Sequence, residues 1–280
     1  MRPKTKLTAH FAIGLTLCGT IPFSISSMHA QGASRLPGGT RYGNALPGLD
    51  PLATIQAEVV PPAHIKPQAE TISVHELLLP AAAVKEFQRS QKAVHSGDFR
   101  SAAEHLRKAI EIAPAFVQAH NNLGASYIQL NEYESAVTEF ETAIALDTKI
   151  EEPYRNLGLG LFLLRRYPEA EVAARRAIKL DPQHSAARYT LGRILAAEGG
   201  GSAEVEQLLR QSVPDFPDAR LPLAQVLLNQ GATDPAAAEL RAYLKSGNAD
   251  PGKRQAVQSW LAQITRTEAK GPEKNAKPAT

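Results

Sequence analysis

His-Asn-Asn-Leu-Gly at residues 120–124 is followed by Tyr-Arg-Asn-Leu-Gly at 154–158 and by Arg-Tyr-Thr-Leu-Gly at 188–192. The three glycines lie 34 residues apart, and so do the leucines that precede them. A constant period of this length is typical of stacked supersecondary units, each of which buries its apolar side against the next. The period therefore favours a repeat array over a domain with one closed core.

Other columns keep the same step, and they are small, aromatic or aliphatic throughout: Ala102, Ala136 and Ala170; Ala109, Ala143 and Ala177; Phe99, Tyr133 and Tyr167; Ile112, Leu146 and Leu180. The pattern resembles the tetratricopeptide repeat (TPR), whose signature is Leu-Gly-x2-Tyr, then Ala-x3-Phe, then Pro. Residues 123–140 match it best, with Leu123, Gly124, Tyr127, Ala136 and Phe140. Later in the pattern, Ala174 replaces the phenylalanine and Thr148 the proline.

The resemblance implies an all-α fold, an α-α solenoid of about five TPR-like helix hairpins with a C-terminal capping helix. We expect the array over 80–248, with hairpins at about 81–114, 117–150, 151–184, 185–217 and 218–248. Their expected helices span about 81–96, 99–113, 117–130, 133–146, 151–164, 167–180, 185–197, 221–229 and 235–244, with one more around Val205 to Leu209. Turns are expected at Gly97, Asn131, Arg165-Arg166, the glycines 199–201 and Gly231. The capping helix is expected over 249–267, with Trp260 as a packing residue.

The first 30 residues resemble a secretory signal peptide. A basic start (Arg2, Lys4, Lys6) precedes an apolar run from Phe11 to Ile25, and Ala30 suits a cleavage site. This predicts a secreted or periplasmic protein whose mature chain has no membrane span. Two alternatives stay open, an uncleaved membrane anchor and a lipoprotein processed at Cys18. If the segment is removed, the protein loses its single cysteine and cannot form a disulfide.

Composition separates two further segments from the array. Residues 31–80 contain 7 Pro and 5 Gly, which predicts an extended linker over 31–79. Within it, the alternation at 71–75 allows either a segment lying across the first repeat or a partner-binding strand. The charged residues 268–280 are expected to form a disordered tail.

Charge and motifs argue against several functional classes. The chain has 31 basic and 28 acidic residues, and the three basic residues of 1–30 account for the whole excess. A neutral mature chain has no general attraction for nucleic acid. Gly247 to Arg254 nearly spells a phosphate-binding loop, but Arg254 replaces the hydroxyl residue that binds magnesium. The histidines show no metal-ligand spacing and no nucleophile motif is present, so we expect no metal, no cofactor and no enzymatic activity.

In TPR proteins the first helices of successive repeats line a concave groove that holds an extended peptide or a partner helix. Carried over by position, that groove consists here of Phe87, Asn121, Ala125, Ile128, Gln129, Arg155, Leu159, Phe162, Leu163, Tyr189 and Arg193. Arg155 and Arg193 are expected to pair with a carboxylate, and Phe162 and Tyr189 to supply apolar anchors. Packing against neighbouring helices is the alternative role for each residue. Ala125 replaces an asparagine of the clamp with which some TPR domains bind chaperone tails, so such tails are not the expected ligand.

The resulting prediction is a non-catalytic scaffold that binds another protein or peptide in the periplasm or cell envelope. Two alternatives come from other classes, namely a lipid-anchored accessory subunit of an envelope assembly complex and a groove that binds a small ligand or sugar. The sequence leaves the partner's identity and the oligomeric state open.

Overall fold

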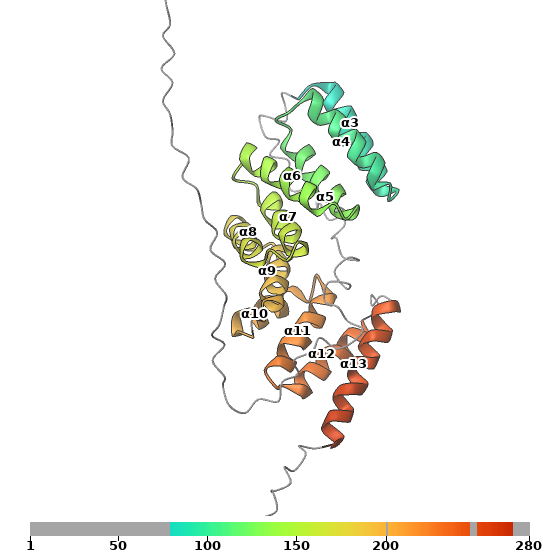
Figure 1. Ribbon diagram of the computed structural model, residues 1–280, viewed down its shortest axis with the longest axis vertical. Coiled ribbons are helices and arrows are strands. Elements are labelled where there is room, and N and C mark those ends of the chain that lie inside the picture. The colour runs from blue at the N-terminus through green and yellow to red at the C-terminus, as the bar shows by residue number, and fades with distance from the viewer. Residues whose placement is uncertain (1–78, 200, 247–250, 271–280) are drawn as a thin grey trace, which may run out of the picture. The chain divides into compact units, whose positions relative to one another are not determined.

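The computed structural model describes residues 79–199, 201–246 and 251–270. The signal peptide, most of the linker with its possible strand, and residues 271–280 lie outside these ranges. Within them the regular structure is entirely helical (Figure 1). Its elements are α3 (Ala81–His95), α4 (Phe99–Ile112), α5 (Val117–Gln129), α6 (Tyr133–Leu146), α7 (Glu151–Leu163), α8 (Tyr167–Leu180), α9 (Ser185–Ala197), α10 (Ala203–Ser212), the 3-10 helix η2 (Pro217–Ala219), α11 (Arg220–Asn229), α12 (Thr233–Lys245) and α13 (Pro251–Lys270).

The helices pair into hairpins as the period predicts. The hairpins are α3–α4, α5–α6, α7–α8, α9–α10 and α11–α12, and each packs on the next along the chain. Helix ends in the hairpins fall within two residues of the expected ones, except that α10 ends at Ser212, three residues past the expected Leu209, and α13 continues to Lys270, past the expected end at 267. None of the described helices combines the length and apolar character needed to cross a membrane.

The turn inside each hairpin has the same backbone conformation. Residues with positive φ in the described part of the chain occupy this one position in every repeat, namely Gly97, Asn131, Arg165, Gly199 and Gly231. Glycine and asparagine adopt this left-handed conformation readily, but arginine does so only with strain. The turn before α4 is also capped, because the Asp98 carboxylate accepts a hydrogen bond from the Ser101 N–H at 3.0 Å.

The periodic small residues are the points of closest helix approach. Ala102, Ala136, Ala170 and their partners seven residues later are completely buried. Gly124 lies directly against the ring of Phe140. The absence of a side chain at Gly124 leaves the space that this ring fills between α5 and α6. Because packing in protein interiors is dense, these columns need small residues for steric reasons.

The core runs along the array in three neighbouring clusters of buried side chains. Leu157 and Leu163 pack against both the first and the middle cluster, and Leu195 packs against the middle and the last. At the C-terminal end, Val257, Trp260 and Ile264 of α13 are buried in the last cluster. This arrangement agrees with the capping role and with Trp260 as a packing residue.

Candidate functional site

The helices that begin the second to fifth hairpins form one face of the array. Helices α5, α7, α9 and α11 contact one another in series, whereas the second helices chiefly contact the first helices on either side. We call the surface of α5, α7, α9 and α11 that faces away from the second helices the first-helix face. All the groove residues expected from the sequence lie on these helices, except Phe87, which lies on α3.

The large apolar groove residues are mostly part of the core. Phe162 is 2% exposed and Tyr189 is 3% exposed. The ring of Phe162 lies 5.7 Å from that of Tyr167, and Tyr189 stacks on Phe216 with ring centres 5.0 Å apart. Ile128 and Leu159 are buried as well. These side chains therefore stabilise the array, and their expected role as ligand anchors stays a prediction.

Phe87 and the smaller or polar groove residues are placed differently. Phe87 is half-buried and packs on Phe116, with ring centres 4.8 Å apart. Ala125 and Gln129 of α5 and Leu163 of α7 are also only half-buried, so they remain partly available to a ligand.

Two buried asparagines join adjacent repeats on the first-helix face. The Asn156 amide nitrogen donates to the amide oxygen of Asn121 at 2.9 Å, which links α7 to α5. Both side chains are buried. A buried amide that lacked such a partner would be strongly unfavourable, so this pair fixes the register of the two helices.

Arg155 is electrostatically compensated within its own helix. Its Nε lies 3.5 Å from a carboxylate oxygen of Glu151, and its Nη2 lies 3.7 Å from Glu152. Glu151 is also 2.8 Å from the imidazole Nδ1 of His184. We did not expect this acidic pair from the sequence. The signal was present, because Glu151 and Glu152 lie one helical turn before Arg155.

Arg193 has a different environment. Its side chain, on α9, is buried, with the whole residue 7% exposed. The guanidinium carbon lies 5.4 Å from the ring centre of Phe162 on α7 and 5.1 Å from that of Tyr189 on α9. In the described part of the chain its Nη2 has no hydrogen-bond partner, and no carboxylate there forms an ion pair with it. Of the two arginines expected to bind a carboxylate, only Arg193 thus lacks an anion among the described residues.

Histidine–glutamate pairs connect helices elsewhere in the array. His120 Nδ1 lies 2.7 Å from Glu139, and its Nε2 lies 3.0 Å from the Pro114 carbonyl. Burial opposes protonation of His120, but these two acceptors outweigh burial and raise the pKa of the imidazole. His105 similarly contacts Glu86 and lowers the pKa of that carboxyl. No three potential metal ligands come together among the described residues.

The near phosphate-loop pattern at residues 247–254 does not form a phosphate site in the described residues. The basic residues of the near phosphate-loop pattern are engaged at the start of α13, where Lys253 pairs with Asp218 and Arg254 donates to the Leu244 carbonyl at 3.0 Å. Residues 247–250 of that pattern lie outside the described ranges.

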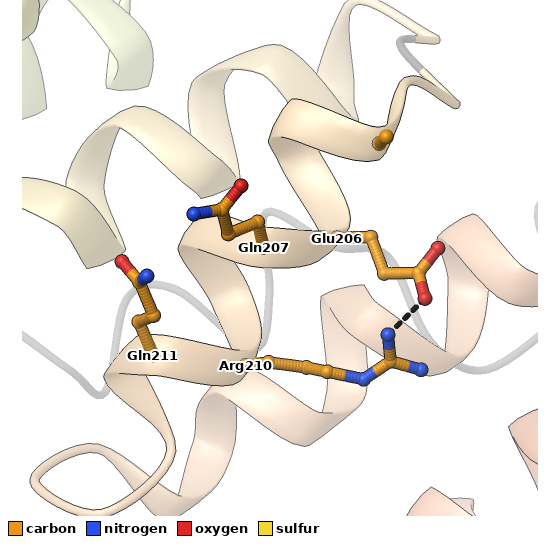
Figure 2. Close-up of a pocket in the computed structure, with 5 residues that line it drawn as sticks. Glu206, Gln207, Arg210 and Gln211 are labelled. Carbon is orange, nitrogen blue, oxygen red and sulfur yellow. Dashed lines mark hydrogen bonds and ion pairs between the residues drawn. The ribbon is translucent and has the colours of Figure 1, made fainter.

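A shallow depression runs along α10 (Figure 2) and is lined by Ala203, Glu206, Gln207, Arg210 and Gln211. The ion pair within it joins Glu206 and Arg210, which face each other one turn apart. Because a single helix supplies the whole lining, no polar groups converge there from different described elements, and the depression is not a candidate site.

Comparison with known proteins agrees with the helical array. Tetratricopeptide repeat profiles match residues 93–157, 151–184 and 201–251. The fold is similar to that of a thermophilic TPR protein from Thermus thermophilus, with a TM-score of 0.54 and 19% identity over 66% of this chain and 100% of that one.

Two further solved structures are comparable. A truncated MamA from Desulfovibrio magneticus RS-1 has a TM-score of 0.53 and 16% identity over 61% of this chain and 99% of that one. YrrB, described as a TPR protein with an unusual peptide-binding site, has a TM-score of 0.50 and 18% identity over 67% of this chain and 92% of that one. At such identities the likeness concerns the fold alone. No protein of curated function matches the sequence significantly.

Proposed function

Since the chain belongs to the tetratricopeptide repeat family, we propose that it is a non-catalytic scaffold that binds an extended peptide or a partner helix on its first-helix face. Proteins of this family generally act as scaffolds for other proteins. The observation that carries the proposal is the serial contact of α5, α7, α9 and α11. It places side chains from successive repeats on one continuous surface, which suits a long, narrow ligand.

The surface has a mixed chemical character that suits a peptide. Ala125, Gln129 and Leu163 are half-buried, although Leu163 also packs against the core. Small and apolar positions allow close approach, and amide and guanidinium groups supply hydrogen bonds to a peptide backbone or side chain. YrrB, whose fold is similar, is described as having a peptide-binding site, which supports the same class of ligand here.

Site-specific photo-crosslinking tests the proposal. A photoreactive side chain at Gln129 is expected to capture one protein from the native cell, whereas the same group at Val172, which is 71% exposed on the second helix α8, should not capture it. The variant Ala125→Trp, which fills the surface beside Gln129, should then abolish capture with helicity unchanged. Equal capture from Gln129 and Val172, or capture that survives Ala125→Trp, would rule out this face.

We further propose that the scaffold works in the periplasm or cell envelope after removal of residues 1–30. The basic start and apolar run of that segment support this localisation. N-terminal sequencing of the protein from fractionated cells tests it. A chain beginning at Gln31 in the periplasmic fraction is the expected result, and an intact Met1 in the cytoplasmic fraction would contradict it.

A further inference from the structure

The buried guanidinium of Arg193 stands apart from the other arginines of the array. Arg175 pairs with Glu171 and Glu204, Arg220 with Glu239, and Arg155 with two carboxylates of its own helix. Arg188, which also has a buried Nε without a partner among the described residues, donates from Nη1 to the Pro182 carbonyl at 2.6 Å. Within the described ranges Arg193 has neither a carboxylate nor a carbonyl acceptor, although only 7% of the residue is exposed.

The repeat itself does not require a cation at this position. Counting back by the 34-residue period, the column of Arg193 contains Leu159 in the preceding hairpin and Ala125 before that. An uncharged side chain of either size thus satisfies the packing of a first helix here. The charge of Arg193 needs another explanation, because a buried cation without an anion is unfavourable in a protein interior.

The two aromatic rings offset only part of the unfavourable free energy of burying the Arg193 charge. Phe162 and Tyr189 lie at distances typical of cation–π contacts, and such contacts attract a guanidinium. An aromatic ring face, however, is a weak substitute for an oxygen lone pair in the plane of the guanidinium N–H groups. The rings therefore hold the group in place. Nη2 is fully buried, whereas Nε and Nη1 are not, and no described residue accepts a hydrogen bond from them, so they can donate to an acceptor on a bound peptide.

We propose that Arg193 is the receptor for a single carboxylate of the peptide bound on the first-helix face. This inference rests on the proposed function. A carboxylate matches the planar donor fork of arginine, and it also neutralises the buried charge. Both an aspartate or glutamate side chain and a free C-terminus supply this group.

The charges around the site favour a carboxylate over a phosphate. A doubly charged phosphate binds best to clusters of basic side chains, whereas the described contacts of the Arg193 guanidinium are with two aromatic rings and not with a second basic side chain. A singly charged carboxylate needs only the one guanidinium that is present.

Peptide arrays with matched charges test the inference on the full chain. The arrays contain the same nonapeptides in three forms: with internal Asp or Glu and an amidated C-terminus, with Asn or Gln and an amidated C-terminus, and with Asn or Gln and a free C-terminus. One of the two carboxylate forms should bind about tenfold more tightly than the uncharged form. Which form does so identifies the source of the carboxylate.

Variants of the protein test whether Arg193 causes the preference for peptides that carry a carboxylate. Arg193→Met should abolish it, and Arg193→Lys, which keeps the charge but loses the planar fork, should keep only part of it. Arg175→Met, on a second helix, is the matched control and should keep all of it. Helical content measured by circular dichroism checks folding, and Arg193→Gln serves as a polar substitute if the methionine variant misfolds.

The outcomes separate this inference from the proposed function. Peptides that bind without regard to carboxylates, or a carboxylate preference that survives in Arg193→Met, would overturn the role of Arg193 and leave the peptide-binding scaffold standing. If none of the three peptide classes binds, both the scaffold proposal and the role of Arg193 fail.

Discussion

Replacing Gly124 by alanine tests whether the repeat period really reports a steric requirement. A Cβ atom added at Gly124 would lie 2.5, 2.8 and 2.9 Å from three carbons of the Phe140 ring. Carbon atoms prefer separations of about 3.5–4.0 Å. Phe140 is 1% exposed, so the ring has no open space into which it can turn. The α5–α6 hairpin must therefore open slightly to admit the methyl group.

Two opposing effects set the magnitude. Overpacking a core typically costs about 1–3 kcal/mol, and alanine in place of glycine within a helix returns about 1 kcal/mol through its better helix propensity. Because three ring carbons lie inside normal contact distance, we place the overpacking in the upper part of that range. The expected net loss in free energy of unfolding is about 1–2 kcal/mol.

The neighbouring repeat supplies a matched control. Gly158 occupies the same column, but Ala174 stands where Phe140 stands one repeat earlier. A Cβ at Gly158 would lie 3.3 Å from the Ala170 carbonyl oxygen and 3.4 Å from the Ala174 Cβ. This contact is tight but close to normal, so Gly158→Ala should change the free energy of unfolding by less than about 1 kcal/mol, because propensity offsets the strain.

Urea denaturation followed by circular dichroism measures both variants, and a double-mutant cycle isolates the contact. Phe140→Leu removes the ring edge, so Gly124→Ala should be at least about 1 kcal/mol less harmful in that background than alone. Full additivity of the two changes, or a Gly124→Ala variant as stable as Gly158→Ala, would refute the steric explanation of the column.

Three further predictions concern stability. Arg165 adopts a left-handed backbone conformation with φ of 59°, so Arg165→Asn should raise the free energy of unfolding by about 0.5–1 kcal/mol; a loss would show that the arginine side chain matters more than the strain. The contact with Glu139 helps to raise the folded-state pKa of His120. It therefore stabilises the fold at pH values below the unfolded-state pKa of about 6.5. This stabilisation is lost as the pH rises through the folded-state pKa. His120→Gln should therefore lose more stability at about pH 5.5 than at about pH 8.5, and an equal loss would contradict the linkage. Phe162→Ala should cost about 3–5 kcal/mol in urea denaturation because the ring is buried, whereas the exposed Val172→Ala should change stability by less than about 0.5 kcal/mol; similar losses for the two would contradict the burial of Phe162.

The last of these predictions bears on how binding can be tested. From sequence position, Phe162 is a natural target for removing an apolar anchor from the groove. Its burial means that Phe162→Ala would weaken the array itself, and lost binding could then reflect lost folding. Half-buried positions such as Ala125 and Gln129 separate the two effects better.

The repeat architecture follows from the sequence alone. The 34-residue step of Gly124, Gly158 and Gly192 and the turn residues Gly97 and Asn131 predicted the helix hairpins, and apart from α10 the hairpin helices end within two residues of the expected positions. This succeeded because each hairpin depends on local helix propensity, turn chemistry and side-chain size, and it contacts chiefly its immediate neighbours. All of these are properties of short stretches, which a periodic sequence displays directly.

Only the tertiary structure decided what the residues on the first-helix face are available to do. A shared column indicates that side chains lie on the same face, but it does not say how deeply each is buried or which charges it meets. Arg155 and Arg193 looked equivalent in the sequence, yet Arg155 meets Glu151 and Glu152, while Arg193 lies between two rings with no anion from the described residues. The acidic partners of Arg155 are local, because they lie one turn earlier on its own helix. The contact of Arg193 with Phe162 joins helices of separate repeats, and the distance between those helices exists only once the chain has folded.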